Sequence, residues 1–304
     1  MATLREIKKR INNIAVIERI TQSMKAVATS KLGQVKAIKE NNKDFFVASD
    51  SIFNNLMSLQ QQFSNTNNSL FNKIFTGLVS SNQTESQNQT PLIVIISSDR
   101  GLCGAYNSNV FRYANKYIKN LSNTNYKILA IGNKAYAWSL KNYNTNTLKM
   151  PISSDFKAIT QDDFMAIVIN AIGFIKMDQI NEVKVIYTSN ISMLSQEVKL
   201  KNLLPISNTA SLEPKAVENK NIVVDELNFT DILEPVLIQY LAYELYQLFI
   251  KSAIAEYSSR MNAMDNASEN SKELKDKLKL IYNRSRQGII TKELTEIIAG
   301  VEAS

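Results

Sequence analysis

The sequence predicts an α/β protein in which the two ends of the chain form a long antiparallel coiled coil. This coiled coil carries a Rossmann-like α/β domain with a mostly parallel sheet. Two observations indicate this fold class. Apolar residues recur at helical spacing over residues 1–59 and 229–304 of the 304-residue chain. Between them, in residues 91–228, short apolar runs alternate with amphipathic segments, as strands and helices do in one α/β domain.

The first segment, residues 1–59, is predicted to be one helix. Apolar residues recur every three or four positions, no proline interrupts them, and Gly33 is the only glycine. We expect the helix to end near Leu59, which gives a length of roughly 80 Å at about 1.5 Å per residue. A helix of that length needs a partner helix or a surrounding shell to cover its apolar face.

The net charge of +7 is concentrated in this helix. Residues 1–43 contain ten Lys and Arg against three Asp and Glu, so the rest of the chain sums to about zero. A basic helix predicts an anionic partner, which could be nucleic acid, an acidic protein surface or a membrane face. The alternative is that these charges belong to a helix face that is simply exposed and well solvated.

The middle of the chain is predicted to hold a linker and a domain. Residues 60–90 are dominated by Asn, Gln, Ser and Thr, which is typical of a polar linker, with one short helix in LFNKIFTGL. Residues 91–228 form the expected α/β domain, the foot. Its predicted strands are 91–98, 127–132, 183–189, 197–206 and 222–227, and its predicted helices are 109–121, 133–143 and 160–177, the last with a cap signal at Thr160.

A second long helix is predicted in residues 229–304. We expect it to begin after Thr230, with Pro235 tolerated in its first turn, and to stop at Gly300. It is longer than the first helix, so its C-terminal tip should stand alone and must be housed by something else. The apolar spacing in neither helix is a strict heptad, so the supercoil should be irregular.

The composition excludes several kinds of chemistry. The chain has no histidine and one cysteine, so histidine-based triads, an internal disulfide and a cysteine-only metal cage are excluded. It has no apolar span of 18 residues and no secretory h-region at its start. We therefore expect no metal, no cofactor and no membrane-spanning helix, although Asp, Glu and Lys could still take part in catalysis.

The stretch SSDRGLCGAYN, which follows the first predicted strand, is the best candidate for an active site. It lacks the glycine spacing of the common phosphate-binding loops, and Cys103 has no histidine to activate it. We interpret it as a tight turn between a strand and a helix. Gly101 and Gly104 would permit the backbone geometry, Cys103 would be a small buried residue, and Ser108 or Asn109 would cap the next helix.

Three blocks of the sequence resemble a known family. They are IKKRINNIAVIERITQSMKAVATSKL near the start, SSDRGLCGAYNSNVF in the middle, and YSSRMNAMDNASENSKEL with YNRSRQGIITKELTEIIAG near the end. With the order of the elements, they resemble the gamma subunit of the rotary ATP synthase over nearly the whole chain. The resemblance implies a central shaft inside a ring of three alpha and three beta subunits. The foot would lie against the epsilon subunit and the membrane ring of c subunits.

The resemblance also implies what this chain does not do. ATP chemistry takes place in the alpha–beta ring, so the chain would be a non-catalytic subunit without a cofactor, and would meet the membrane only through the complex. The chain has no insert with paired cysteines of the chloroplast kind and no presequence, which favours a bacterial protein at the cytoplasmic face of the inner membrane. Acidic loops of the beta subunits would be the anionic partner of the basic helix.

Residue by residue, the resemblance implies two sets of partner contacts. The contacts with the beta loops, here called the catch loops, are Arg286, Gln287, Thr291, Glu296, Met24, Lys25 and Arg260. Contacts of the foot near the c ring are expected at Lys31 and Glu226. The alternative for each residue is a solvated charge or ordinary coiled-coil packing.

Two other functions remain open on the residues alone. One is an α/β enzyme with helical arms that uses the Asp99–Arg100 pair. The other is a coiled-coil protein that binds nucleic acid through the basic first helix. Against the second, the lysines alternate with apolar positions needed for packing, and no aromatic residues are interleaved for base stacking.

Overall fold

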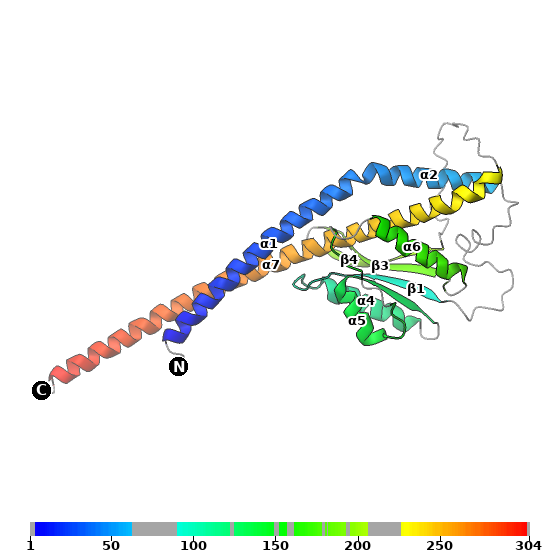
Figure 1. The fold of residues 1–304 in the computed structure, drawn as a ribbon. Coiled ribbons are helices and arrows are strands. Elements are labelled where there is room, and N and C mark those ends of the chain that lie inside the picture. Colours follow the sequence, from blue (N-terminus) through cyan, green and yellow to red (C-terminus); the bar gives the residue numbers. More distant parts are fainter. Residues whose placement is uncertain are drawn as a thin grey trace.

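Two long helices lie side by side as a shaft, and an α/β domain packs against one half of it (Figure 1). The computed structural model describes residues 4–62, 90–121, 125–148, 152–156, 161–177, 180, 182–192, 195–205 and 226–302. Side chains at 55–62, 176, 226–233 and 301–302 lie outside this description. The helix predicted at 70–78 and the cap predicted at Thr160 fall outside the described residues.

The N-terminal side of the shaft consists of α1 (Leu4–Asn41) and α2 (Lys43–Gln62). The prediction of one uninterrupted helix is wrong at Asn42, where the axis bends (Figure 1). Two adjacent Asn residues stand here, and asparagine side chains compete with helical hydrogen bonding. The ladder nevertheless continues across the bend, since Asn42 N–H donates to the Ile38 carbonyl at 3.1 Å and Phe46 N–H to the Asn42 carbonyl at 3.0 Å.

The C-terminal side of the shaft is α7 (Glu226–Glu302), a single helix of 77 residues. It is longer than predicted at both ends, because it begins before Thr230 and continues past Gly300. Pro235 is therefore inside the helix rather than in its first turn. The strand predicted at 222–227 is wrong at Glu226 and Leu227, which belong to α7, and its other residues are not described.

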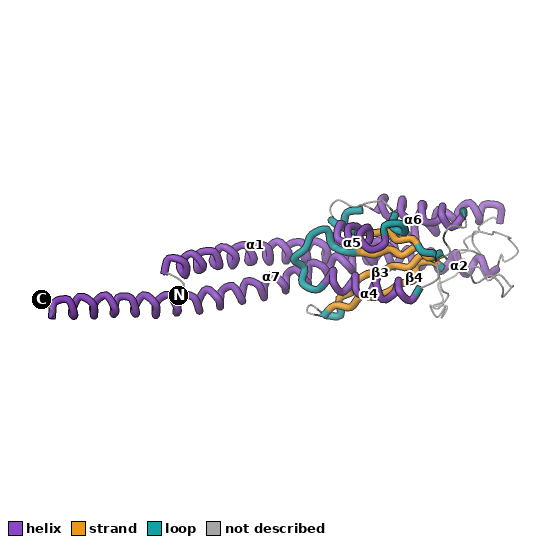
Figure 2. The backbone as a smooth tube through the Cα atoms, turned by 90° about the horizontal axis from the view of Figure 1, so that it is seen from below, coloured by secondary structure: helices purple, strands orange, loops and turns teal. Residues whose placement is uncertain are grey.

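The two sides of the shaft run antiparallel, as predicted. Three contacts set their register: Lys25 Nζ lies 2.5 Å from Asp265 Oδ1, Lys275 pairs with Glu18, and the ring of Phe53 stacks on that of Tyr240 with centroids 3.9 Å apart. Figure 2 shows the same pairing from below, with the C-terminal end of α7 extending beyond the start of α1. The tip of the longer helix therefore has no partner helix among the described residues.

The foot contains a four-stranded sheet in the order β2-β1-β3-β4. Its strands are β1 (Pro91–Ile96), β2 (Lys127–Ile131), β3 (Glu182–Asn190) and β4 (Gln196–Leu204). β1 pairs in parallel with β2 and β3, whereas β4 runs antiparallel to β3 at the edge. The prediction of a mostly parallel sheet is confirmed.

Helices cover both faces of this sheet, so the foot has three layers (Figure 1). On one face, α4 (Tyr106–Asn120) and α5 (Asn133–Tyr143) pack against Ile93 and Ile95 of β1. On the other face, α6 (Gln161–Lys176) and α7 pack against Leu92, Val94 and Ile96. Alternate residues of a strand point to opposite faces, and this explains why all six residues of β1 are apolar and buried.

The turn from β2 into α5 depends on Gly132. Its φ is +96°, and a Cβ at this position would lie 2.5 Å from the Ser97 carbonyl oxygen. Its own N–H donates to the Ile152 carbonyl at 2.7 Å. Glycine is therefore required both by the backbone angle and by the close approach of the loop that follows β1.

We predict that Gly132→Ala lowers the free energy of unfolding by about 2–4 kcal/mol, measured as a lower urea midpoint, because the clash is with backbone and cannot be relieved by a side-chain rotation. Gly288→Ala is the matched control, since Gly288 lies in α7 with nothing within 4 Å of a Cβ. Alanine there should stabilise the helix by about 0.5–1 kcal/mol. Equal midpoints for the two variants would contradict the prediction.

Candidate functional site

The loop after β1 is held by Asp99, whose two carboxylate oxygens are both used inside the foot. Oδ1 accepts a hydrogen bond from the backbone N–H of Asn133, the first residue of α5, at 2.9 Å. Oδ2 accepts from the Ser153 hydroxyl at 2.7 Å and from the Ser154 N–H at 3.0 Å. In many α/β proteins a phosphate binds at such a helix N-terminus beyond the carboxyl end of a strand. Here a side chain of the protein occupies that position.

Cys103 lies in the same turn and is buried. Asn107 Nδ2 donates to its sulfur at 3.2 Å, and the Ser98 hydroxyl lies 3.7 Å from it. Its carbonyl oxygen accepts a hydrogen bond from the Ser259 hydroxyl of α7 at 2.7 Å. These contacts give Cys103 a place in the packing of the turn against the shaft.

The two glycines of this turn differ in their roles. Gly104 has φ +58°, and a Cβ there would lie 3.2 Å from Ser259 Oγ, so glycine lets the turn approach α7 closely. The reason given for Gly101 is wrong, because its φ is not positive and nothing lies within 4 Å of a Cβ there. The neighbouring Leu102 adopts the left-handed conformation instead, with φ 62°, and is exposed.

The predicted helix caps after this turn are also wrong. α4 begins at Tyr106 with Ala105 at the N-cap, so Ser108 and Asn109 are already inside the first turn. Tyr106 is buried against Cys103 and Ala255 of α7. The helix thus starts early enough to place the Tyr106 ring in the joint between foot and shaft.

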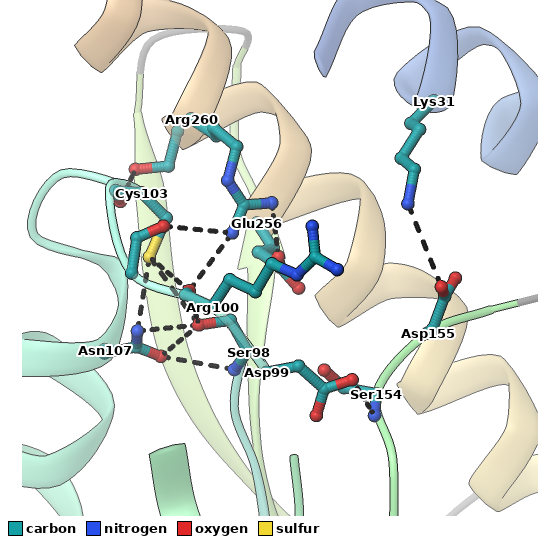
Figure 3. A network of polar contacts seen from close by, with 12 residues as sticks. Lys31, Ser98, Asp99, Arg100, Cys103, Asn107, Ser154, Asp155, Glu256 and Arg260 are labelled. Carbon is teal, nitrogen blue, oxygen red and sulfur yellow. Dashed lines mark hydrogen bonds and ion pairs between the residues drawn. The ribbon is translucent and has the colours of Figure 1, made fainter. Parts of the chain in front are cut away.

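A buried ion pair fastens α7 to this turn (Figure 3). Arg260 Nη1 lies 2.5 Å from Glu256 Oε1, one helical turn away, and the two side chains are only 12% and 6% exposed. The other terminal nitrogen of Arg260 donates to the carbonyls of Arg100, at 3.2 Å, and Gly101, at 3.4 Å. One guanidinium therefore bridges the shaft and the loop after β1.

Further polar contacts join α7 to the sheet of the foot. The Thr188 N–H donates to the Ser252 hydroxyl at 3.0 Å, and Gln196 Nε2 donates to the Ala255 carbonyl at 2.7 Å. Asn190 Nδ2 lies 3.2 Å from the Ser258 hydroxyl. These bonds come from β3 and β4, so α7 is tied to the foot along more than one helical turn.

Burial raises the pKa of Glu256 to about 7, and the charge of Arg260 opposes that rise. The folded state then holds the Glu256 proton more tightly than the unfolded chain does, whose pKa is near 4.5. The stability that this proton contributes is present below about pH 4.5 and is lost as the pH rises through about 7.

A cleft of about 400 Å³ opens between the shaft and this joint. It brings together three residues predicted as partner contacts, since Met24, Lys31 and Arg260 all line it. Met24 is half-buried, but the nitrogens of Arg260 already bind Glu256 and the turn. Arg260 is thus engaged within the chain in this conformation. Lys25, next to Met24, is paired with Asp265.

The two residues predicted near the c ring are not close together. Lys31 Nζ lies 3.9 Å from Asp155 Oδ2 and 5.7 Å from the centre of the Tyr257 ring, inside the cleft. Glu226 is the first residue of α7, 31 positions before Tyr257, which is about 46 Å along a helix. The side chain of Glu226 lies outside the described residues. The contacts of Lys31 and Glu226 with a c ring stay predictions.

The tip of α7 carries the remaining predicted contacts. Up to residue 300, where the description of side chains ends, Ser285 is the last residue that is not exposed, and every residue from 286 to 300 is exposed. Arg286 and Gln287 stand at the base of this tip, Thr291 donates its hydroxyl to the Gln287 carbonyl at 2.9 Å, and Glu296 pairs with Lys292 at 3.5 Å. The tip also exposes large apolar side chains, namely Ile289, Ile290, Leu294, Ile297 and Ile298.

Among the described residues, no helix is apolar enough over 18 residues to cross a membrane. Within the same residues, no three Cys, Asp or Glu side chains are grouped so that they could hold a metal ion. The geometry instead defines a class of protein: an asymmetric two-helix shaft with a bare tip, tied by buried polar bonds to an α/β foot.

Comparison with known proteins places the chain in a family. A model of the ATP synthase family matches residues 3–303. The ATP synthase gamma chain of Clostridium kluyveri is 33% identical over 304 residues, covering 99% of this chain and 98% of that one. The ATP synthase gamma chain of Pelagibacter ubique is 29% identical over 305 residues, covering 100% of both chains. The chain belongs to the ATP synthase family, among its gamma chains.

Solved structures agree with this assignment of the fold. A chain in the Euglena gracilis mitochondrial ATP synthase, in the part described as OSCP/F1/c-ring, aligns with a TM-score of 0.62 and 17% identity over 99% of this chain and 94% of its own length. A chain in the central stalk and c ring of the Tetrahymena thermophila mitochondrial ATP synthase aligns with a TM-score of 0.55 and 25% identity over 82% and 99%. The predicted family and fold class are confirmed.

Asp99→Asn tests the structural interpretation of the loop after β1. The amide keeps the size of the carboxylate, but it loses one acceptor and the negative charge at the start of α5. We expect a loss of about 1–3 kcal/mol in unfolding free energy, measured by urea denaturation, with turnover retained in a complex assembled with partner subunits. Unchanged stability together with lost turnover would favour the enzyme interpretation.

Glu256→Gln tests the buried proton. The unfolding free energy of the wild type, relative to this variant, should fall by about 3 kcal/mol between pH 4.5 and 7, because glutamine does not titrate. The measurement is urea unfolding of both proteins across this range. A difference between them that does not change with pH would contradict a raised pKa at Glu256.

Proposed function

We propose that this chain is the central rotor shaft of an ATP synthase, which transmits torque between a proton-driven c ring and a catalytic ring of alpha and beta subunits. The observation that carries the proposal is the bare tip of α7, with five large exposed apolar side chains beyond Ser285. Such a surface in water favours enclosure by a partner. The foot, fastened at the other half of the shaft, supplies the second point at which torque can enter.

The chain itself acts as a non-catalytic subunit in this proposal. The loop after β1 is the best candidate for an active site, but its Asp99 carboxylate accepts hydrogen bonds from α5 and from the 153–154 loop. Its Cys103 is buried. The carbonyls of Arg100 and Gly101 bind Arg260. These contacts support the proposal that ATP chemistry belongs to the alpha and beta subunits and that this chain needs no cofactor.

Charge supports the same partners. Lys8, Lys9 and Arg10 are exposed on α1, and Arg284 and Arg286 are exposed on α7. The register set by Glu18 and Lys275 brings the start of α1 to the level of Ile289, so these five cations lie at about the same level of the shaft. A basic collar of this kind attracts acidic catch loops without fixing one register, which suits a rotating contact.

The coupling itself is a linkage between rotor angle and subunit state. Each beta subunit has open and closed states, and a shaft biases that equilibrium only when it contacts the two states differently. The axis bends between α1 and α2, and α7 continues alone, so the shaft has no rotational symmetry. In a threefold ring it touches three identical subunits differently, and rotation changes which one is held open.

The remaining partners follow from the same family. The foot would bind the epsilon subunit and the c ring, and the chain would lie at the cytoplasmic face of a bacterial inner membrane as a peripheral component of the complex. No nucleic acid is expected. The cationic side chains of α1 that would bind it are partly used within the chain, since Lys25 pairs with Asp265 and Lys31 with Asp155.

The contacts at the base of the tip are tested by Arg286→Ala combined with Gln287→Ala. If both side chains grip a catch loop, ATPase rate and ATP synthesis should fall together, by roughly tenfold or more, because each charged hydrogen bond contributes about 1.5–3 kcal/mol where it is desolvated. The helix should persist, since alanine is the best helix former. The measurement is steady-state turnover of the complex assembled with alpha and beta subunits.

The matched control removes Glu273 and Lys277 in the same helix, an exposed pair 3.8 Å apart that lies in the two-helix part of the shaft. Its double alanine variant should keep wild-type rates. Subunit stoichiometry and helix content are compared for all proteins. Wild-type rates from a correctly assembled Arg286/Gln287 variant would remove these two contacts and leave the shaft to act by shape alone.

A further inference from the structure

The buried pair between Glu256 and Arg260 has a geometry that a surface ion pair lacks. Arg260 binds Glu256 and, at the same time, two carbonyls of a loop about 160 residues away in sequence. Glu256 contributes nothing to the loop directly. Its carboxylate faces the guanidinium and fixes where the guanidinium points (Figure 3).

We propose that Glu256 is a positioning residue whose protonation state decides whether Arg260 holds the 98–104 turn against the shaft. The inference deepens the proposed function, because that turn and Arg260 border the cleft in which catch-loop contacts are expected, but the latch itself is a property of this chain alone. We call the Glu256–Arg260 pair with its bonds to the Arg100 and Gly101 carbonyls the latch, which is closed while those bonds are made and open when Arg260 leaves them. With Glu256 ionised, the latch is closed. With Glu256 protonated, a nearly buried guanidinium has no anion, and Arg260 turns toward the open cleft.

Whether protonation opens or closes the latch depends on the pKa of Glu256 in the two arrangements. In the closed latch, Arg260 lowers the pKa of Glu256 from the higher value that burial alone would give, and the pKa is about 7. In the open latch Glu256 stays buried but loses that cation, so its pKa is higher still. Protonation therefore favours the open latch. The equilibrium shifts as the pH falls from the open-latch pKa toward about 7, the closed-latch pKa, and it levels off below that value. This local effect is separate from unfolding, for which the reference state is a solvated carboxyl.

The other groups around Glu256 do not replace Arg260. They are Tyr257 of α7, Lys31 of α1, Tyr106 of α4, Asp99 and Arg100 of the turn, and Asp155 of the following loop. The ammonium of Lys31 is directed to Asp155. Asp99 is an anion and raises the pKa of Glu256 further. Arg260 is thus the cation in direct contact with the Glu256 carboxylate.

The 98–104 turn is strained at Leu102, so it can relax when Arg260 releases it. Leu102 holds φ at 62° between Gly101 and Gly104, and a residue with a Cβ gains from leaving that region. The Arg260 bonds to Arg100 and Gly101 lie directly before it. Release of Arg260 therefore frees the turn at its strained residue, and at the same time presents a guanidinium to the cleft, where a catch loop could bind it.

Hydrogen exchange of the full chain, without partners, tests the latch. Peptides covering residues 98–106 are followed at pH 6, 7 and 8, and rates are corrected for the intrinsic pH dependence of exchange. Wild-type protection should fall by up to about tenfold between pH 8 and pH 6, mostly above pH 7, because the closed-latch pKa is about 7 and the open-latch pKa is higher. Glu256→Gln should show the low protection at every pH.

Two controls keep the test decisive. Glu244→Gln changes another shaft carboxylate, which pairs with Lys201 away from the turn, and should keep the wild-type profile. Arg260→Gln should be unprotected at every pH, like Glu256→Gln. Wild-type protection that does not change with pH would overturn the proposal, even if a variant failed to fold. Full protection in folded Glu256→Gln would overturn it too. Neither result touches the rotor function, which the tip variants test.

Discussion

The pairing of α1 with α7 is the interaction on which the rest of the structure depends. A helix of 77 residues cannot bury its own apolar stripe, so one side must be covered by another helix or by a sheet. Over its lower half α7 is covered by both, since α1 and α2 lie on one side and β3 with α6 on another. Higher up only α1 remains, and beyond Ser285 nothing in the described chain covers it. The shaft thus passes from core helix to coiled coil to bare helix along one element.

The foot is joined to the shaft by two different kinds of contact. Apolar residues of α7, such as Leu245 and Phe249, belong to the same core as one face of the sheet. One to three turns later the joint becomes polar: Ser252 is bonded to β3, and Arg260, paired with Glu256, is bonded to the loop after β1. Apolar packing supplies stability without direction, whereas buried hydrogen bonds fix orientation because a misplaced group costs its full desolvation. A part that carries torque needs both.

Much of this fold could be predicted from the sequence because periodicity is a local signal. The helix expected at 133–143 is α5 without change, and the apolar run PLIVII is the central strand. The bend at Asn42 could not be predicted, because the hydrogen-bond ladder continues across it and the apolar spacing hardly changes. The Glu256–Arg260 pair looks in sequence like an ordinary i, i+4 surface pair. Its burial depends on a turn 160 residues away, which no local pattern encodes.

The same limit applies to the site residues. The sequence pointed to Gly101 and Gly104 as the residues with unusual backbone angles. In the structure Gly104 and Leu102 have positive φ and Gly101 does not, and this depends on the assembled turn. Lys31 and Glu226 were grouped by analogy, and the length of α7 separates them. The bare tip itself was predicted because its helical pattern is longer than that of its partner, a feature that can be counted directly from the chain. The contact residues within the tip, such as Arg286 and Gln287, were assigned from the family resemblance instead.

The unequal lengths of the two helices also make the shaft mechanically graded. From Leu4 toward the foot, a twisting load is shared by two helices that pack on each other and are joined by the pairs Lys25–Asp265 and Glu18–Lys275. Above that level the load passes through one helix, held only by its own backbone hydrogen bonds. A single helix is easier to twist than two packed ones, so the bare tip is the more compliant segment of the shaft.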